Sequence, residues 1–184
     1  RAQLVAGAMI LAPTWYDPCR DRLCSFEEAV DQMEAEVRTF REDRAGYLAY
    51  GMRAWKRGRL QEVFGAHKPM VFQDKPEGLA AKAFKTGRGV LVWAGKETAD
   101  LAESALVRRV EDGFLRSRGL GAELVPPLSL VTDDLGIYYD PNRESRLERL
   151  ILAPLPPGGR VRAEKLLRAV VKARVTKYNL GAAA

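Results

Sequence analysis

The sequence predicts an α/β protein with a Rossmann-like parallel sheet, and three observations carry this prediction. An apolar run of the buried type, GVLVW, occupies residues 89–93, and a second strand-like run occupies residues 105–110. A short helical pattern at residues 98–104 separates the two runs, and a strand–helix–strand passage is typical of a parallel strand pair. Amphipathic helical patterns lie on both sides of this passage.

The segment before residue 88 alternates helical and strand-like patterns. Residues 3–12 are apolar and predict a buried strand or a short apolar helix, and a loop rich in Trp, Tyr, Pro and Cys follows to residue 24. Ser25 and Glu28 have the spacing of a capping box, so a helix with one apolar stripe should extend to about residue 43. The next patterns predict a strand at 47–51, a basic helix ending at Gly65, a strand at 70–73 and a helix at 76–86 before Gly87.

The segment after residue 88 begins with the two apolar runs and continues with further elements. Residues 128–132 and 136–139 are strand-like and flank an Asp pair, which predicts a hairpin. Ser145 and Glu148 repeat the capping-box spacing and predict a helix through residue 152, and residues 160–174 predict a basic amphipathic helix. We therefore divide the chain loosely into a lead-in segment, 1–88, and a Rossmann-like segment, 89–184, within what we expect to be one domain.

Composition and charge restrict the classes of function. The chain has 184 residues, 47% hydrophobic and 29% charged, which suits one globular domain or two small ones. No apolar stretch approaches the roughly 18 residues of a membrane span. The net charge is +6, and basic residues concentrate at 38–59 and 160–177. These clusters suit a solvated surface, or a membrane surface or acidic ligand; no nucleic-acid-binding signature accompanies them.

The potential metal ligands are few and scattered. Cys19 and Cys24 lie five positions apart and supply only half of a zinc site. His67 is the single histidine, and it lies far from both cysteines in the sequence. We therefore expect a reduced cysteine pair in a loop and no bound metal.

The strongest candidate site follows the two apolar runs, because open parallel sheets bind ligands at the carboxyl ends of their strands. Neither GxGxxG nor the P-loop pattern occurs, which excludes the standard dinucleotide and P-loop sites. After the first run, Gly95 would let the backbone approach a ligand and Lys96 could pair with an anion. After the second run, Glu111 or Asp112 could act as a general base, a nucleophile or a ligand of sugar hydroxyls.

Two further residues near these carboxylates are candidates for substrate binding. Arg116 and Ser117 could bind an anionic substrate. The alternative is structural: a salt link between Glu111 and Arg116 or Arg118, with Gly113 turning the chain. Spacing alone leaves both interpretations open.

The run that follows offers a second group of candidates. Asp134 belongs to an Asp pair that resembles a sugar-hydroxyl or calcium loop, although the calcium spacing D-x-D-x-D-G is absent. Tyr138 could supply a stacking platform for a sugar or a base. The alternatives are ordinary turn chemistry for the aspartates and a core-packing role for one of two adjacent tyrosine rings.

Several long motifs resemble those of the KpsC-like capsule polysaccharide proteins. They occur in the family's order: VEDGFLRS at 110–117, GLG at 119–121, PLSLV at 127–131, DDLGIYYD at 133–140, SRLERL at 145–150 and TKYN at 176–179. The opening of the chain resembles the lead-in to the C-terminal module of these proteins. The sequence departs from the family at WAGK, residues 93–96, and in a crossover before Glu111 that is several residues shorter.

The resemblance implies a retaining β-Kdo glycosyltransferase that uses CMP-Kdo to build the oligo-Kdo lipid linker of capsular polysaccharide. Its modules are GT-B-like, with two Rossmann-like domains, and this chain would be the acceptor-side half, inactive alone. Glu111 matches the family carboxylate, accompanied by Asp112, Arg116 and Ser117. The nucleophilic carboxylate and the donor domain would lie beyond residue 184.

The resemblance also implies the surroundings of the protein. We expect no cofactor besides the CMP-Kdo donor, a phosphatidylglycerol-based Kdo-glycolipid acceptor, and a capsule synthesis and export complex as partner. We expect a cytoplasmic protein peripheral to the inner membrane, with an anionic membrane surface as a further partner and no nucleic acid. The alternatives are a non-catalytic export or binding protein of the same family, or a truncated inactive copy.

Overall fold

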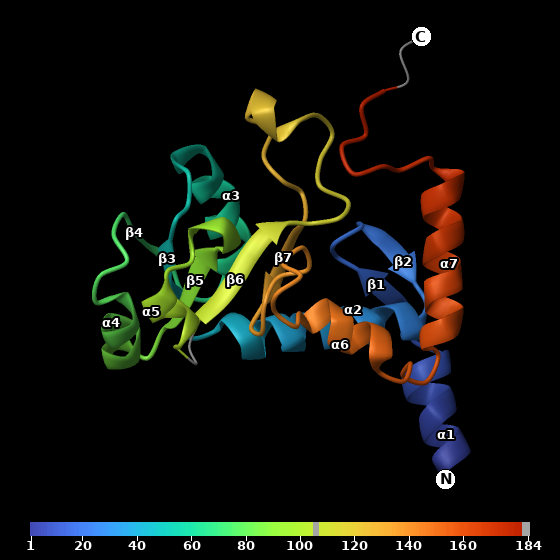
Figure 1. Ribbon diagram of the computed structural model, residues 1–184. Coiled ribbons are helices and arrows are strands. Elements are labelled where there is room, and N and C mark those ends of the chain that lie inside the picture. The colour runs from blue at the N-terminus through green and yellow to red at the C-terminus, as the bar shows by residue number, and fades with distance from the viewer. Residues whose placement is uncertain (105–106, 182–184) are drawn as a thin grey trace. The chain divides into compact units, whose positions relative to one another are not determined.

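The computed structural model describes residues 1–104 and 107–181 and divides into two compact units, Arg1–Arg44 and Ala45–Ala184 (Figure 1). The sequence suggested a loose division near residue 88 instead. Strands β3 (Tyr47–Tyr50) and β5 (Gly89–Trp93), which lie on either side of residue 88, pair with each other in one sheet.

The first unit contains helical segments and a small hairpin. Helix α1 (Ala2–Ala6) continues into a π-helical turn, Gly7–Leu11, so the apolar segment is helical, and the buried-strand alternative is wrong. Its side chains meet no core, and Leu4 is 77% exposed. Strands β1 (Trp15–Asp17) and β2 (Arg22–Cys24) form an antiparallel pair within the predicted loop. The Asp17 carboxylate accepts hydrogen bonds from the N–H groups of Cys19 and Arg20 and thereby closes the turn.

Helix α2 (Phe26–Asp43) begins and ends where the sequence predicted. The Ser25 hydroxyl accepts a hydrogen bond from the Glu28 N–H at 3.2 Å, and a Glu28 carboxylate oxygen accepts one from the Ser25 N–H at 3.2 Å. This reciprocal pair confirms the capping box. Both cysteines of this unit are free thiols: Cys19 is exposed in the hairpin turn, and Cys24 lies in β2 rather than in a loop.

The second unit is built on a mixed sheet with the strand order β4-β3-β5-β6-β7. Strands β4 (Val71–Gln73), β3, β5 and β6 (Val107–Asp112) are parallel, and β7 (Leu130–Asp133) is antiparallel to β6. The α/β class is confirmed, with one antiparallel strand at the edge of the parallel sheet. Residues 105 and 106, part of the expected strand at 105–110, lie outside the described residues.

Helices cover both faces of this sheet. Helix α3 (Ala54–Phe64) packs Leu60 and Phe64 into a core cluster on one face. Helices α4 (Leu79–Thr86) and α5 (Ala99–Ala102) contribute Leu79 and Leu101 to the cluster on the other face. Helix α4 begins three residues later than predicted, because Gly78 takes a left-handed conformation with a φ of 69° immediately before it. Helices α6 (Arg146–Leu152) and α7 (Gly159–Lys172) follow β7, as predicted.

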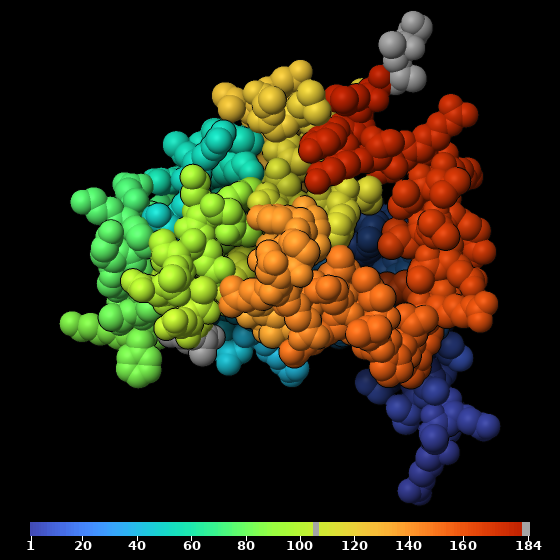
Figure 2. Space-filling model, in the orientation of Figure 1, coloured from blue at the N-terminus to red at the C-terminus, as the bar shows by residue number. Residues whose placement is uncertain are grey.

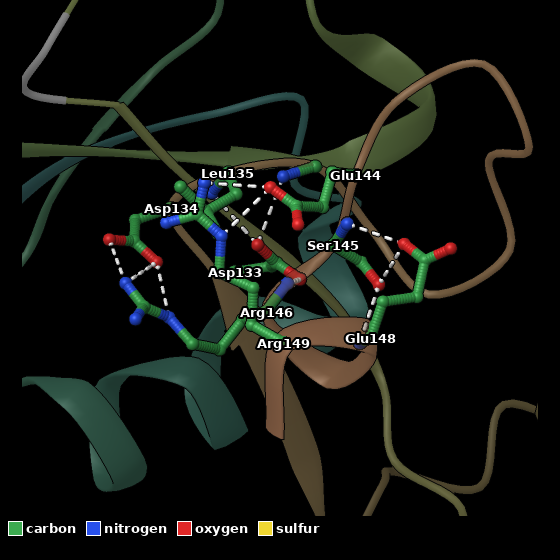
Figure 3. A network of polar contacts seen from close by, with 9 residues as sticks. Asp133, Asp134, Leu135, Glu144, Ser145, Arg146, Glu148 and Arg149 are labelled. Atoms are coloured by element: carbon green, nitrogen blue, oxygen red, sulfur yellow. Dashed lines mark hydrogen bonds and ion pairs between the residues drawn. The ribbon is translucent and has the colours of Figure 1, made fainter. Parts of the chain in front are cut away.

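The hairpin predicted around the Asp pair is wrong, because the chain turns after β7 instead of forming a strand at residues 136–139. The Asp133 carboxylate explains the turn (Figure 3). One of its oxygens accepts hydrogen bonds from the N–H groups of Leu135 and Gly136, and the other accepts one from the Arg146 N–H. A side chain on Gly136 would lie 2.7 Å from the Glu144 carbonyl oxygen, so the turn packs against the segment before α6.

Candidate functional site

A cavity of about 410 Å³ opens at the carboxyl ends of β3, β5 and β6. This is the edge at which parallel sheets place their ligands. The sequence-predicted residues Gly95, Lys96, Glu111 and Asp112 all belong to its wall. The complete lining is Gly51, Arg53, Trp55, Lys56, Trp93, Gly95, Lys96, Glu111, Asp112, Gly121 and Ala122.

Glu111 and Asp112 are the last two residues of β6, and both line the cavity although adjacent side chains on a strand point to opposite faces. The next residue is Gly113, whose N–H donates to the Ser129 carbonyl at 2.9 Å. A side chain at Gly113 would lie 2.2 Å from the Ser129 hydroxyl oxygen, so this close turn requires glycine.

The Asp112 carboxylate is held between two cations. Lys56 Nζ lies 3.2 Å from Asp112 Oδ1, and Arg116 Nε lies 2.6 Å from Asp112 Oδ2. The side chains of Lys56 and Arg116 are only 10% and 1% exposed. Because each buried cation binds a different oxygen, the two together fix the orientation of this carboxylate.

Arg116 and Ser117 support the site without lining the cavity. Arg116 Nη1 donates to the Ser117 hydroxyl at 2.7 Å, and that hydroxyl donates to the Gly119 carbonyl at 2.7 Å. Both residues are 1% exposed. Their contacts match the structural alternative, except that the partner of Arg116 is Asp112 rather than Glu111.

Lys56 also lies between two indole rings. Its Nζ is 3.4 Å from the centroid of the Trp93 ring and 5.3 Å from that of Trp55, distances at which a cation is attracted to a ring face. Burial lowers the pKa of Lys56, and the opposing charge of Asp112 partly offsets that effect. The lysine therefore contacts both indole rings and the Asp112 carboxylate.

Glu111 has a different environment from Asp112. Burial is the main cause that raises the pKa of the Glu111 carboxyl, and the neighbouring negative charge of Asp112 raises it further. The Asp112 N–H donates to Glu111 Oε1 at 2.9 Å, and this hydrogen bond lowers the pKa of the Glu111 carboxyl. Two adjacent carboxyls in different environments are suited to separate acid–base roles.

The turn after β5 brings Gly95 and Lys96 to the cavity. It is a 3-10 turn, Ala94–Lys96, and it packs closely on the loop after β3. A side chain at Gly51, whose φ is 78°, would lie 2.5 Å from the Lys96 Cβ. The close approach of these two loops positions the Lys96 ammonium group on the cavity wall.

Two buried donors at this site have no hydrogen-bond acceptor among the described residues: Trp55 Nε1 and Arg116 Nη2. Trp55 lines the cavity, and Gly121, also in its wall, lies so close to Arg116 that a Cβ there would be 2.8 Å from Nη2. Buried donors in folded proteins usually have a partner. An oxygen-rich ligand could supply one.

Asp134 and Tyr138 lie outside this cavity. Asp134 forms an ion pair with Arg146 of α6, which lowers the pKa of the Asp134 carboxyl (Figure 3). Tyr138 lines a separate cavity of about 230 Å³ and packs on Phe114, with ring centroids 4.8 Å apart. Its hydroxyl is 3.4 Å from the Asp112 carbonyl oxygen. Neither side chain is brought together with Glu111 and Asp112 in the first cavity.

Sequence reasoning missed the contribution of α3 to the site. Arg53, Trp55 and Lys56 line the cavity, although the sequence showed the two basic residues only as part of a charged cluster. A usable signal was present: the strand before them is parallel to β5, so its carboxyl end must open at the same edge of the sheet. The ion pair between Lys56 and Asp112 spans 56 positions, which local patterns do not reveal.

Within residues 1–104 and 107–181 no helix has the length and apolar character needed to cross a membrane. The same ranges contain no group of three His, Cys, Asp or Glu side chains arranged to hold a metal ion.

Comparisons with known sequences agree on one family. Residues 93–180 match the family model described as capsule polysaccharide biosynthesis protein. The capsule polysaccharide modification protein LipA of Neisseria meningitidis is 32% identical over 185 residues, which cover 97% of this chain and 26% of LipA. The lipopolysaccharide-processing protein LpsZ of Rhizobium meliloti is 37% identical over 112 residues, covering 56% of this chain and 26% of LpsZ.

Two solved structures of KpsC transferases are also similar to this chain. The β-Kdo 2,4 transferase of Thermosulfurimonas dismutans KpsC is similar with a TM-score of 0.54 and 33% identity, over 73% of this chain and 42% of that one. The β-Kdo 2,7 transferase of the same protein is similar with a TM-score of 0.53 and 25% identity, over 69% of this chain and 42% of that one. The chain spans 26% of the length of its curated relatives. On sequence and on structure, the chain belongs to the KpsC-like family of capsule polysaccharide biosynthesis proteins.

Proposed function

We propose that this chain is the acceptor-side half of a GT-B-like β-Kdo transferase module, which uses CMP-Kdo to build the Kdo lipid linker of capsular polysaccharide. The observation that carries the proposal is the composition of the cavity at the ends of β3, β5 and β6. It combines a carboxylate pair with cationic side chains and two indole rings. Kdo is an acidic sugar, and each of these groups suits one part of it.

Recognition of the sugar follows from the lining residues. Lys96 and Arg53 are exposed cations that can pair with the carboxylate of Kdo. Trp55 can donate its buried indole N–H to a sugar oxygen. Because the indole rings also offer apolar surface, the cavity suits a ligand with both polar edges and C–H faces.

Glu111 is proposed as the proton acceptor of the transfer step. The acceptor hydroxyl oxygen forms a bond to the anomeric carbon of the transferred Kdo, and the hydroxyl proton passes to Glu111. The bond from that carbon to the leaving group, which is CMP or the nucleophilic carboxylate expected in the donor domain, breaks and its electron pair stays on that group. A carboxyl whose pKa is raised is a better base at neutral pH than an ordinary glutamate. Asp112, held by Lys56 and Arg116, stays in place to bind acceptor hydroxyls and to stabilise positive charge on the reacting sugar.

Binding of the methyl glycoside of β-Kdo to the chain of residues 1–184 tests this proposal. We expect backbone amide resonances of Gly95 and Lys56 to shift on titration in NMR spectra. The Lys96→Gln variant should bind about tenfold more weakly, because a hydrogen bond to a charged group is lost. Lys85→Gln, a matched change at an exposed site on α4, should bind as the wild type does.

Two results would count against the proposal. One is the absence of binding by a folded chain at millimolar sugar. The other is binding that shifts resonances remote from the cavity and is equally strong in the Lys96→Gln variant. Either would favour a capsule protein of this family that does not hold a Kdo acceptor at this edge of the sheet.

A further inference from the structure

A second cavity shares Gly95 with the first one. It has a volume of about 250 Å³ and is lined by the turn after β5, by β6 and by the loop before α6. Gly95 belongs to the walls of both cavities, and a Cβ built there would meet nothing within 4 Å. The second cavity is smaller than the roughly 300 Å³ at which pockets for drug-sized ligands begin, so it suits a single sugar ring.

Glu111 of the first cavity lies close to Tyr139 of the second. Glu111 belongs to the wall of the first cavity, and Tyr139 to the wall of the second. After burial, the negative charge of Glu111 is the largest cause that raises the pKa of the Tyr139 phenol, and a hydrogen bond between the two side chains adds to it. The carboxylate proposed to take the acceptor proton is therefore within reach of both cavities.

The second cavity carries an accessible cation. Glu97 pairs with both Arg109 and Arg143, so this group of three side chains has one excess positive charge. The Arg109 side chain is 3% exposed, whereas that of Arg143 is 36% exposed. Arg143 Nη1 donates to Glu97 at 3.1 Å and Nη2 donates to the Ala102 carbonyl at 3.3 Å, which leaves three of the five guanidinium donors for a ligand.

Asp140 is the other charged group in the wall, and it limits which ligands fit. One of its oxygens accepts hydrogen bonds from the backbone and side-chain nitrogens of Asn142. The Asp140 carboxylate repels an anion close to it and accepts from hydroxyl groups. An acidic sugar fits both charges when its carboxylate faces Arg143 and its hydroxyls face Asp140.

We propose, on the basis of the function proposed above, that this second cavity binds the next sugar of the acceptor. The first cavity holds the terminal Kdo, whose hydroxyl is close to Glu111, and the second holds the Kdo residue to which that sugar is linked. Arg143 contacts the carboxylate of this second sugar and is a specificity-determining residue. The site therefore binds an acceptor of two acidic sugars in preference to one.

Titration of the chain of residues 1–184 with two probes tests the second cavity. The probes are the methyl glycoside of β-Kdo and the methyl glycoside of the β-linked Kdo disaccharide. We expect the disaccharide to bind at least about tenfold more tightly, because its second sugar binds without a second loss of translational freedom. The amide resonances of Gly136 and Ile137, in the wall of the second cavity, should shift with the disaccharide and not with the monosaccharide.

Variants of Arg143 test whether this residue causes the higher affinity for the disaccharide. Arg143→Met should bring the affinity for the disaccharide down to that for the monosaccharide and leave the monosaccharide affinity unchanged. Arg149→Met is the matched control, because Arg149 also pairs with one glutamate, Glu144, but does not line the cavity. If Arg143→Met does not fold, Arg143→Lys keeps the positive charge but not the planar set of donors, and should lose at least about threefold in disaccharide affinity.

The outcomes separate this inference from the proposed function. Equal affinities of the wild type for the two probes would contradict binding of a second sugar in the second cavity. An undiminished preference for the disaccharide in a folded Arg143 variant would contradict it as well. Neither result would affect the proposed function. If neither probe binds a folded chain, the proposed acceptor function fails and the second cavity fails with it.

Discussion

At Asp112, a lysine from α3 and an arginine from the loop after β6 meet one carboxylate. Such a pair contributes little net stability when both partners are replaced together, but removing one partner leaves a buried charge without compensation. Because the Lys56 and Asp112 side chains are 10% and 19% exposed, most of the interaction is shielded from water. The arrangement fixes the geometry of a reacting group at the expense of tolerance to substitution.

Substitution of Lys56 by Met tests this arrangement. Met occupies the place of the lysine but cannot pair with Asp112, which keeps Arg116 as its remaining partner. We therefore expect the free energy of unfolding to fall by about 2 kcal/mol, the loss of one hydrogen bond between charged groups. Arg160→Met removes an exposed ion pair with Glu164 and should change it by less than about 0.5 kcal/mol. Urea unfolding monitored by circular dichroism measures both. A loss for Lys56→Met no larger than for the control would show that Asp112 does not depend on Lys56.

Glu111 predicts a dependence of stability on pH. Its pKa is raised in the folded chain, so between the ordinary value of 4.5 and the raised value the folded state binds more protons than the unfolded state. The contribution of this group to stability is therefore fully present below pH 4.5 and is lost as the pH rises through the folded pKa. The Glu111→Gln variant lacks this loss.

The measurement is the thermal midpoint of wild type and Glu111→Gln from pH 4 to pH 8. We expect the variant to be the more stable at pH 7, with a difference that shrinks toward pH 4. Glu77→Gln, at an exposed position before α4, should follow the wild type throughout. A Glu111→Gln variant that is less stable than the wild type at pH 7 would contradict the environment described for this carboxyl.

At the scale of single elements, Ser145 shows how a local pattern sets a boundary. Its N–H donates to Glu148 Oε2 at 2.6 Å, and its hydroxyl accepts from the Glu148 N–H at 3.2 Å. Ser145 is 1% exposed, and the helix that it caps has only seven residues. A short helix depends on its caps, since it has few internal hydrogen bonds.

Replacement of Ser145 by Ala should lower the free energy of unfolding by about 1–2 kcal/mol, the upper part of the range for N-cap substitutions. Thr86→Ala near the end of α4 removes a hydroxyl that only donates back to the helix carbonyls of Lys82 and Ala83, and should stay within about 0.5 kcal/mol of the wild type. Chemical denaturation of both variants measures the two changes in the free energy of unfolding. Equal stability of the two would mean that the cap does not hold α6.

The sequence predicted an element correctly where the contact that determines it lies within a few residues. The capping boxes at Ser25 and Ser145 lie within four residues, and both predicted helices form. The false strand at 136–139 had the apolar pattern of a strand, but the Asp133 carboxylate binds the next backbone N–H groups and turns the chain. The hairpin of β1 and β2 was missed because its strands are three residues long, shorter than the runs that show alternation.

The candidate site could be predicted only along the strands that carry it. Gly95, Lys96, Glu111 and Asp112 follow strong strand signals, and the sheet rule brings them to one cavity. The partners of Asp112 could not be predicted in the same way. Lys56 reaches it from a helix 56 positions earlier. For Arg116 the sequence left open substrate binding or a salt link to Glu111, and the structure shows an ion pair with Asp112 instead.

At the scale of the whole molecule, α7 presents an extended basic and apolar surface. The helix lies at the surface along its length (Figure 2), and its apolar side chains Val161, Leu166, Leu167 and Val171 are each more than 60% exposed. Its basic residues are Arg160, Arg162, Lys165, Arg168 and Lys172. Helices with this composition lie in the interface of anionic membranes. We propose that α7 attaches the chain to an anionic membrane surface.

Flotation with vesicles of phosphatidylglycerol and phosphatidylcholine tests this attachment. A double variant, Arg162→Glu with Arg168→Glu, should bind at least about tenfold more weakly, since each basic residue near such a surface contributes about 1 kcal/mol. Lys82→Glu with Lys85→Glu on α4 makes the same change of charge elsewhere and should bind as the wild type does. Attachment through α7 would be excluded if the wild type did not float at low salt, or if both double variants lost binding equally.

Under the proposed function, the carboxylates at the end of β6 form the reaction centre of a Kdo transferase. The most direct test of this claim is Kdo transfer from CMP-Kdo to a Kdo-lipid acceptor by a protein that carries this chain within a complete transferase module. The Glu111→Gln and Asp112→Asn variants should each lose at least about 100-fold in rate while remaining folded. Transfer at the wild-type rate by both folded variants would contradict the claim and place the chemistry elsewhere in the module.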